Sequence, residues 1–236
     1  MNVLVRKLRS GLTRLRSLAM SQRFGVPPER IYRNSFYHDG GFSKTEHSAD
    51  VIAQWAADQL MPASLLDLGC GAGHYLRAFE QLGINGFGLE ASPEGVALAG
   101  PKVTALSFDL RRPVYFNRQF DLVICVEVAE HIPLKSSRNL VASIARNAGR
   151  YVLFTAAPPG TPGLDHINCQ SPGFWHALFG ESGFRVSDDL TDNLRETCKR
   201  ANTAAWWFDW SWCLERVDRE GRVVQPAARD EKGKAG

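Results

Sequence analysis

A glycine-rich loop is the first part of this sequence whose residues could do chemistry. It spans residues 67–73 and carries Gly69, Gly71 and Gly73. Glycines let a backbone approach a ligand closely, and a helix that begins after Gly73 would present N–H groups to an anion. A nicotinamide dinucleotide loop needs its third glycine at position 74, where this chain has His74. The loop therefore predicts a ligand site of a different kind.

Acidic residues close the apolar runs on and after this loop. They are Asp67, Glu90, Asp109 and Glu127. A carboxylate at the end of the second strand of such a sheet can accept hydrogen bonds from both ribose hydroxyls, which favours Glu90 as a ribose ligand. The alternative is that Glu90 and Asp109 are ordinary turn or cap residues. Several acidic strand ends in register favour a ligand site.

Two histidines are candidates for acid–base chemistry. His131 and His166 lie in the second half of the chain. Imidazole titrates near neutral pH, so it suits removal of a proton from a hydroxyl group. The alternative is that His131 caps a helix that begins near Pro133 and that His166 only orders its loop. A loop rich in glycine and proline is a poor place for a core histidine, so we predict a catalytic role for His166.

Alternating strands and helices must position these residues. Buried parallel strands read as short apolar runs, and helices as apolar residues at a spacing of three to four. The predicted strands are 64–68, 86–89, 103–108, 120–126 and 151–155, and the predicted helices are 46–60, 74–82, 93–99, 134–147 and 171–182. Residues 206–214 add a final antiparallel strand or pair. This order predicts an α/β fold with a doubly wound, Rossmann-like sheet that is mostly parallel.

The G-x-G-x-G spacing behind Asp67 resembles motif I of the class I S-adenosylmethionine-dependent methyltransferases. Residues 120–131 resemble motif IV, and residues 154–175 resemble a subgroup that carries an EVAEH block and an H-x-N-x-Q motif. The resemblance covers about 48–214. It implies S-adenosylmethionine as cofactor, with the glycine loop on its methionine part. It also implies that Asp109 contacts the adenine amino group, that Phe108 stacks on the ring and that Glu127 lies beneath the cofactor.

The E-x-x-E-H block with a later histidine also resembles the metal site of small-RNA end 2′-O-methyltransferases and of some ubiquinone-pathway O-methyltransferases. There, a divalent ion gathers neighbouring oxygens of a diol. That resemblance would make Glu127, Glu130, His131 and His166 metal ligands. The alternative is a metal-free base site, which we favour from the sequence. A nucleic acid is not expected as substrate, because the chain lacks a basic recognition domain.

The subgroup's members are mostly small-molecule or glycan-associated methyltransferases. We therefore predict O-methylation of a hydroxyl on a small molecule or glycan precursor. The alternatives are an N-methyltransferase of a small amine and a non-catalytic cofactor-binding regulatory protein. The chain departs from the subgroup's E-Q-W segment at 169–171 and has Cys198 where tryptophan is common. The acceptor itself does not follow from these motifs, and neither does the oligomeric state.

Composition sets the limits of these predictions. A chain of 236 residues with 44% hydrophobic residues can bury one substantial core, and a net charge of +3 is too small for a dedicated nucleic-acid binder. Five cysteines without a CxxC pair favour a reducing, cytoplasmic setting. The tryptophan cluster is predicted to be mainly core packing. It consists of Trp206, Trp207, Trp210 and Trp212.

Three segments are predicted along the chain. Residues 1–45 form a basic amphipathic N-terminal segment whose polar, aromatic-dotted end could fold over a ligand. Within it, residues 1–23 would either pack on the domain, which we favour, or contact an anionic membrane surface. Residues 46–224 form the methyltransferase-like domain. Residues 225–236 are predicted to be a disordered tail.

Overall fold

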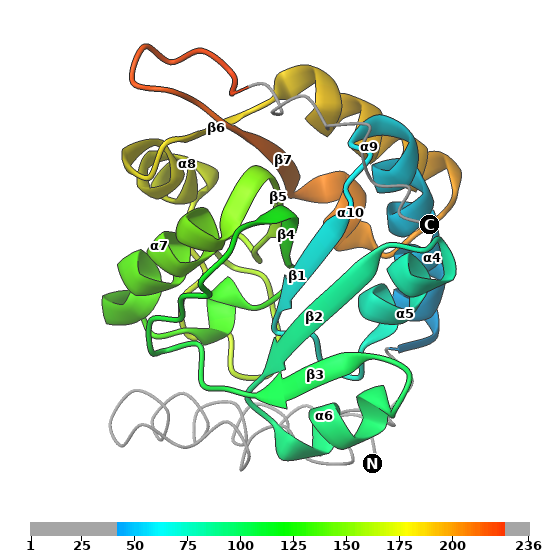
Figure 1. The fold of residues 1–236 in the computed structure, drawn as a ribbon. Coiled ribbons are helices and arrows are strands. Elements are labelled where there is room, and N and C mark those ends of the chain that lie inside the picture. Colours follow the sequence, from blue (N-terminus) through cyan, green and yellow to red (C-terminus); the bar gives the residue numbers. More distant parts are fainter. Residues whose placement is uncertain (1–41, 225–236) are drawn as a thin grey trace, which may run out of the picture.

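The computed structural model describes the backbone of residues 42–224 and places a seven-stranded sheet at their centre (Figure 1). The strand order is β3-β2-β1-β4-β5-β7-β6. All neighbouring pairs from β3 to β5 are parallel, and β7 runs antiparallel to both β5 and β6. The strands are β1 (Ser64–Leu68), β2 (Asn85–Glu90), β3 (Thr104–Ser107), β4 (Phe120–Cys125), β5 (Ala148–Thr155), β6 (Phe184–Val186) and β7 (Ser211–Arg216). The predicted doubly wound, mostly parallel sheet with an antiparallel last strand is confirmed.

Helices cover both faces of this sheet (Figure 1). On one face lie α4 (Phe42–Gln59), α5 (His74–Gln81), α9 (Asp188–Arg200) and α10 (Ala205–Asp209). On the other lie α7 (Ser137–Asn147) and α8 (Pro172–Glu181). The short helix α6 (Pro93–Ala99) contacts β2 and β3, and the single turns η1 (Ala129–His131) and η2 (Leu134–Ser136) precede α7.

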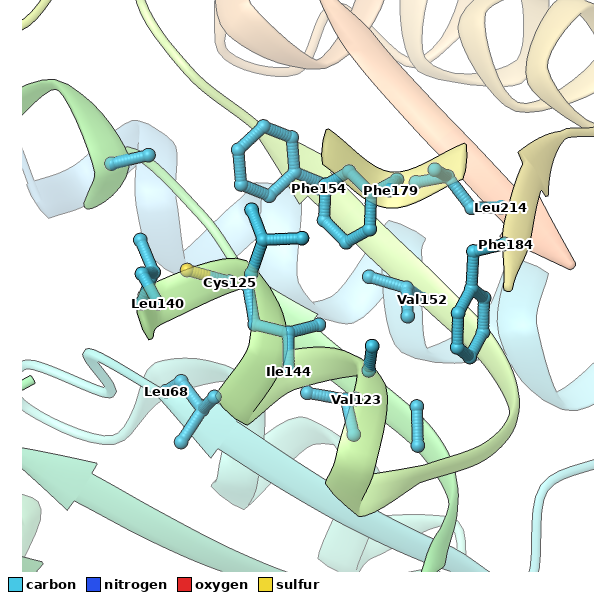
Figure 2. Close-up of a cluster of buried hydrophobic side chains, with 14 of the residues drawn as sticks. Leu68, Val123, Cys125, Leu140, Ile144, Val152, Phe154, Phe179, Phe184 and Leu214 are labelled. Carbon is cyan, nitrogen blue, oxygen red and sulfur yellow. The ribbon is translucent and has the colours of Figure 1, made fainter. Parts of the chain in front are cut away.

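The alternation of side chains along the central strands explains why both faces carry a core. In β4, Val123 and Cys125 point to the α7 side, whereas Leu122 and Ile124 point to the α4 side. All four are fully buried, as expected for a parallel strand that is covered on both faces. Figure 2 shows the α7-side cluster, where side chains of β1, β4 and β5 meet those of α7 and α8. This packing fixes the strands whose ends carry the candidate site.

The C-terminal third differs from the sequence prediction. The predicted strand 206–214 is a short helix, α10, followed by β7, and α9 and β6 were not predicted. Helix α9 is mostly charged and polar, and only Leu190, Leu194 and Cys198 repeat at helical spacing on its buried side. A single apolar stripe of this kind is a weak periodic signal.

The first described helix begins earlier than predicted. Helix α4 begins at Phe42, four residues before the helix predicted from residue 46, so the boundary drawn at 45/46 falls inside a helix. The predictions for residues 1–41 and for the tail 225–236 lie outside the described residues. Among the helices of residues 42–224, none combines the length and the apolar character that a membrane span requires.

Candidate active site

The candidate residues gather at the carboxyl edge of the parallel strands. Asp67 lies near the end of β1, Glu90 ends β2, and Asp109 follows β3. The segment after β4 carries Glu127 and continues into η1. In open α/β sheets ligands bind outside these carboxyl ends, at the point where the strand order reverses. Here, that point lies between β1 and β4.

The glycine loop between β1 and α5 has a backbone that other residues rarely adopt. The φ angles are +88° at Gly69, +51° at Gly71 and +74° at Gly73. A Cβ atom on Gly69 would also lie 2.3 Å from Cγ2 of Val128, in the segment after β4. Position 69 must therefore be glycine, because the segment after β4 packs directly against the backbone there.

Glu90 is the carboxylate that supports this loop. Its Oε2 accepts a hydrogen bond from the Gly71 N–H at 2.9 Å, and its Oε1 accepts one from the Ser92 N–H at 2.8 Å. Burial raises the pKa of Glu90, and these backbone N–H groups oppose that shift. A carboxylate oxygen has a second lone pair, so Glu90 can still accept hydrogen bonds from a ligand.

Asp67 is buried beneath the same loop. It is 1% exposed, and its Oδ2 has no hydrogen-bond partner. Burial, and then the nearby Glu90, raise the pKa of Asp67 well above its usual range. A buried carboxyl oxygen without a partner is costly and favours a nearby ligand that donates to it. Its predicted cofactor role remains a prediction.

Asp109 and Phe108 lie beyond β3. The Asp109 carboxylate pairs with the Arg111 guanidinium, with an Nη2–Oδ2 distance of 2.7 Å. Burial raises its pKa and the hydrogen bonds from Arg111 lower it, with a net shift downward. Phe108 is half-buried against the α7-side core, and its N–H donates to the Glu90 carbonyl at 2.8 Å. Phe108 is therefore tied to β2 and Asp109 to Arg111, and the adenine contacts of both residues remain predictions.

Glu127 lies two residues after the end of β4 in a left-handed backbone conformation, with φ +53°. The Thr155 hydroxyl accepts from the Glu127 N–H at 2.8 Å and donates to its Oε1 at 2.9 Å. The Trp210 indole N–H donates to the same oxygen at 2.9 Å. Burial raises the pKa of Glu127, while Trp210 and Thr155 oppose the shift. The carboxyl group is thus held in place by the ends of β5 and β7.

The last candidates form one cluster. A ligand atom from each of Glu130, His131 and His166 lies within 4.8 Å of the others, and the two imidazole centroids are 5.0 Å apart. Glu130 is fully buried and its Oε2 has no hydrogen-bond partner. Burial, and then the nearby Glu127, raise the pKa of Glu130 well above its usual range. Glu127, the fourth predicted metal ligand, is not part of this cluster.

Backbone carbonyls fix the tautomer of both histidines. His131 Nδ1 lies 3.1 Å from the Asp165 carbonyl oxygen, and His166 Nδ1 lies 3.2 Å from the Thr161 carbonyl oxygen. A carbonyl only accepts, so each Nδ1 carries the proton and each Nε2 has the lone pair. Burial, and then His166, lower the pKa of His131 to about 4, so His131 is neutral at neutral pH. The neutral imidazole of His131 and the neighbouring imidazole of His166 suit a general base or a metal ligand.

Gly163 makes room for His166. A Cβ atom at position 163 would lie 2.0 Å from Nε2 of His166 and almost as close to two ring carbons. The imidazole therefore occupies the space that any side chain at 163 would need.

The sequence did not reveal Thr155 and Trp210 as site residues. Thr155 ends β5, and Trp210 immediately precedes the antiparallel β7, in which Ser211 pairs with Thr155. The strand register therefore brings them together. Trp207 and Trp212 are buried and Trp206 is half-buried, so most of the tryptophan cluster is packing, as predicted.

Comparison with known families gives one match over most of the described chain. Residues 43–188 match the family model described as a methyltransferase domain. The ubiquinone biosynthesis O-methyltransferase of Pseudomonas paraeruginosa is 27% identical over 178 residues, which cover 72% of this chain and 72% of that protein.

Solved structures share the fold at lower identity. The magnesium protoporphyrin IX methyltransferase of Synechocystis, solved with bound S-adenosylhomocysteine, superimposes with a TM-score of 0.56 and 20% identity over 88% of this chain and 99% of that one. The amino pentose methyltransferase CalS10 of Micromonospora echinaspora gives a TM-score of 0.59 and 17% identity over 79% and 98%.

Proposed function

This chain belongs to the methyltransferase-domain family and is an S-adenosylmethionine-dependent methyltransferase, and we propose that its acceptor is a hydroxyl group on a small molecule or a glycan precursor. The similarity to O-methyltransferases of small molecules supports this acceptor class. The cluster of Glu130, His131 and His166 carries the proposal, because a hydroxyl acceptor must lose a proton and this cluster can promote that loss.

The reaction is an in-line displacement. The acceptor oxygen forms a bond to the methyl carbon while the bond from that carbon to sulfur breaks, and the sulfonium becomes a neutral thioether. The hydroxyl proton leaves to a base. The glycine loop and Glu90 would hold the cofactor and orient the methyl group, and such positioning supplies much of the rate enhancement.

The donor set of the cluster fits a divalent cation. Two imidazoles and a buried carboxyl oxygen without a hydrogen-bond partner are ligands that such an ion takes, and the backbone carbonyls on Nδ1 are the usual outer partners of ligating histidines. A bound cation would lower the pKa of the acceptor hydroxyl. We therefore propose Glu130, His131 and His166 as metal ligands. This reverses the preference drawn from the sequence for His166 as a metal-free base.

One experiment distinguishes a site that holds a metal ion from a site in which His166 is a metal-free base. Transfer of tritiated methyl groups to a panel of catechols, sugars and amino sugars would identify an acceptor. For a metal site, EDTA should abolish transfer to a hydroxyl acceptor and Mg²⁺ or Mn²⁺ should restore it. The His166→Ala variant should lose about 10²- to 10⁴-fold in kcat and keep its affinity for S-adenosylhomocysteine. His176→Ala, on α8, is the matched control. Activity that is indifferent to EDTA but lost in His166→Ala would identify His166 as a base.

Methylation of an amine is the second candidate. One solved structure of the same fold is an amino pentose methyltransferase, and the carboxyl group of Glu127, whose pKa is raised by burial, can take the proton that a protonated amine must lose before it attacks. A neutral amine already carries its attacking lone pair, so its methylation should resist EDTA. Transfer only to amino sugars, with EDTA present, would replace the O-methyltransferase proposal.

A further inference from the structure

The loop that carries His166 is fastened to the segment that carries His131. The N–H groups of Ile167 and Asn168 both donate to the Glu130 carbonyl oxygen at 2.9 Å. In the other direction, His131 Nδ1 donates to the Asp165 carbonyl at 3.1 Å. These hydrogen bonds bring the two segments side by side, although more than thirty residues separate them in the sequence.

The Asn168 side chain completes this connection. It is 1% exposed, and its amide nitrogen donates to the Ala129 carbonyl at 3.3 Å and to the Ser137 hydroxyl at 2.9 Å. Its Oδ1 accepts from Gln170 Nε2 at 3.0 Å. A buried amide whose groups are paired in this way permits one arrangement of its surroundings, because any other would leave polar atoms without partners.

We propose that Asn168 is a positioning residue that sets the distance and the ring orientation between His131 and His166. The inference rests on the proposed function, in which these two imidazoles act together. The hydrogen bonds of the Asn168 side chain reach Ala129, Ser137 and Gln170 and neither imidazole. It acts through Ala129 and Glu130, the two residues immediately before His131, and through its own backbone neighbours after His166.

A purely structural role is the alternative, and the chain offers a matched control for it. Asn147 is also fully buried, and its amide nitrogen donates to the Val114 and Ser143 carbonyls at 2.9 and 2.8 Å while its Oδ1 accepts from the Phe116 N–H. Asn147 is the last residue of α7, and Ser137, the partner of Asn168, is the first. The two amides therefore sit at opposite ends of a helix that is roughly 16 Å long.

The test measures the tautomers of His131 and His166 directly and needs neither acceptor nor metal. Nitrogen-15 NMR distinguishes the Nδ1–H from the Nε2–H tautomer, and spectra of His131→Gln and His166→Gln assign the two signals. With EDTA at neutral pH, wild-type protein should show the Nδ1–H tautomer at both rings. Asn168→Ala should lose at least half of that tautomer at His131. Asn147→Ala should lower the melting temperature and leave both histidine signals unchanged.

Milder variants cover the case in which Asn168→Ala does not fold. Asn168→Asp has the same shape but cannot donate to Ala129, and Ser137→Ala removes one partner only, so both should shift the His131 tautomer in the same direction by a smaller amount. Wild-type histidine signals in whichever of these variants fold would overturn the positioning role. The same result would follow if Asn147→Ala disturbed the histidines as strongly.

Binding of Mn²⁺ then separates this inference from the proposed function. In the presence of S-adenosylhomocysteine, Asn168→Ala should bind Mn²⁺ about 10- to 100-fold more weakly than wild type, and Asn147→Ala should bind it normally. If wild type binds no Mn²⁺ while its histidine tautomers still depend on Asn168, the metal site is wrong and the positioning role stands.

Discussion

Two residues at the carboxyl edge hold a backbone conformation that non-glycine residues seldom adopt. Glu127 has φ +53° and Asp165 has φ +55°. Each such residue costs about 1 kcal/mol or more, and strain of this kind concentrates at functional sites. Here, hydrogen bonds accompany it: Glu127 is bonded to Thr155, and the Asp165 carbonyl accepts from His131. The conformation of Asp165 thus presents its carbonyl to His131, and that of Glu127 presents its carboxyl group to Thr155 and Trp210.

The contacts of Glu90 lead to a prediction about cofactor affinity. Its two oxygens already accept one backbone N–H each, so alanine would loosen the glycine loop as well as remove a ligand contact. Glu90→Gln is the milder change, because it keeps the shape and one acceptor oxygen and loses the charge and one backbone contact. A hydrogen bond to a charged group contributes about 1.5 to 3 kcal/mol, so affinity for S-adenosylhomocysteine should fall at least tenfold in calorimetry.

The control for this change is Glu94→Gln in the first turn of α6, which should bind S-adenosylhomocysteine as wild type does. Equal affinity in Glu90→Gln and wild type would show that Glu90 supports the loop and does not bind the ribose.

The direction of β7 brings Trp210 into the site. Because it runs antiparallel to β5, its first residues lie beside the carboxyl end of β5, and Ser211 pairs with Thr155. Trp210 consequently reaches Glu127. A parallel strand in the same place would put its first residues at the opposite edge of the sheet.

The other end of β7 gives a prediction of stability. Arg216 donates to the carbonyls of Gly149 and Ala145 at 3.1 and 2.6 Å and also to that of Ala148, and its guanidinium stacks on Phe184. Carbonyls at a helix end lack partners within the helix, and a cation there is favoured by the helix dipole. Arg216→Met should lower the free energy of unfolding by about 2 to 4 kcal/mol in urea titrations.

These contacts lie at the start of β5, away from the carboxyl edge, so cofactor affinity should not change. Arg185→Met, at the exposed position of β6, removes a single hydrogen bond of 3.5 Å and should cost far less. An equal loss in both variants would refute the role of Arg216 at the end of α7.

At the scale of the whole molecule, the described residues already form a sheet with a core on each face, and every candidate cofactor residue lies between Asp67 and Glu127. Deletion of residues 1–23 should therefore leave thermal unfolding and affinity for S-adenosylhomocysteine within error of the full chain. If these residues contact membranes, as their basic amphipathic pattern allows, the deletion should also abolish sedimentation with phosphatidylserine vesicles.

Neutral phosphatidylcholine vesicles are the control for charge. Equal sedimentation of the full chain and the deletion variant would show that residues 1–23 do not bind membranes. Loss of cofactor affinity in the deletion variant would show that these residues contribute to the site.

The sequence by itself determined the parallel half of the fold and the residues at its carboxyl edge. β1 and α6 match their predicted bounds because an apolar run and a Ser-Pro helix start are local signals. The glycine loop and Glu90 were equally readable, since each needs a particular residue type at a particular strand end. Helix α9 and strand β6 were not, because a mostly polar helix and a three-residue strand owe their structure to packing.

Only the tertiary structure decided how the site is assembled. Nothing local in the sequence indicates that the Trp210 indole donates a hydrogen bond to Glu127, or that His166 lies beside Glu130 and His131. These contacts depend on strand register and on the docking of one loop against another. Both are set by hydrogen bonds between residues far apart in the chain, and local propensity carries no information about such pairs.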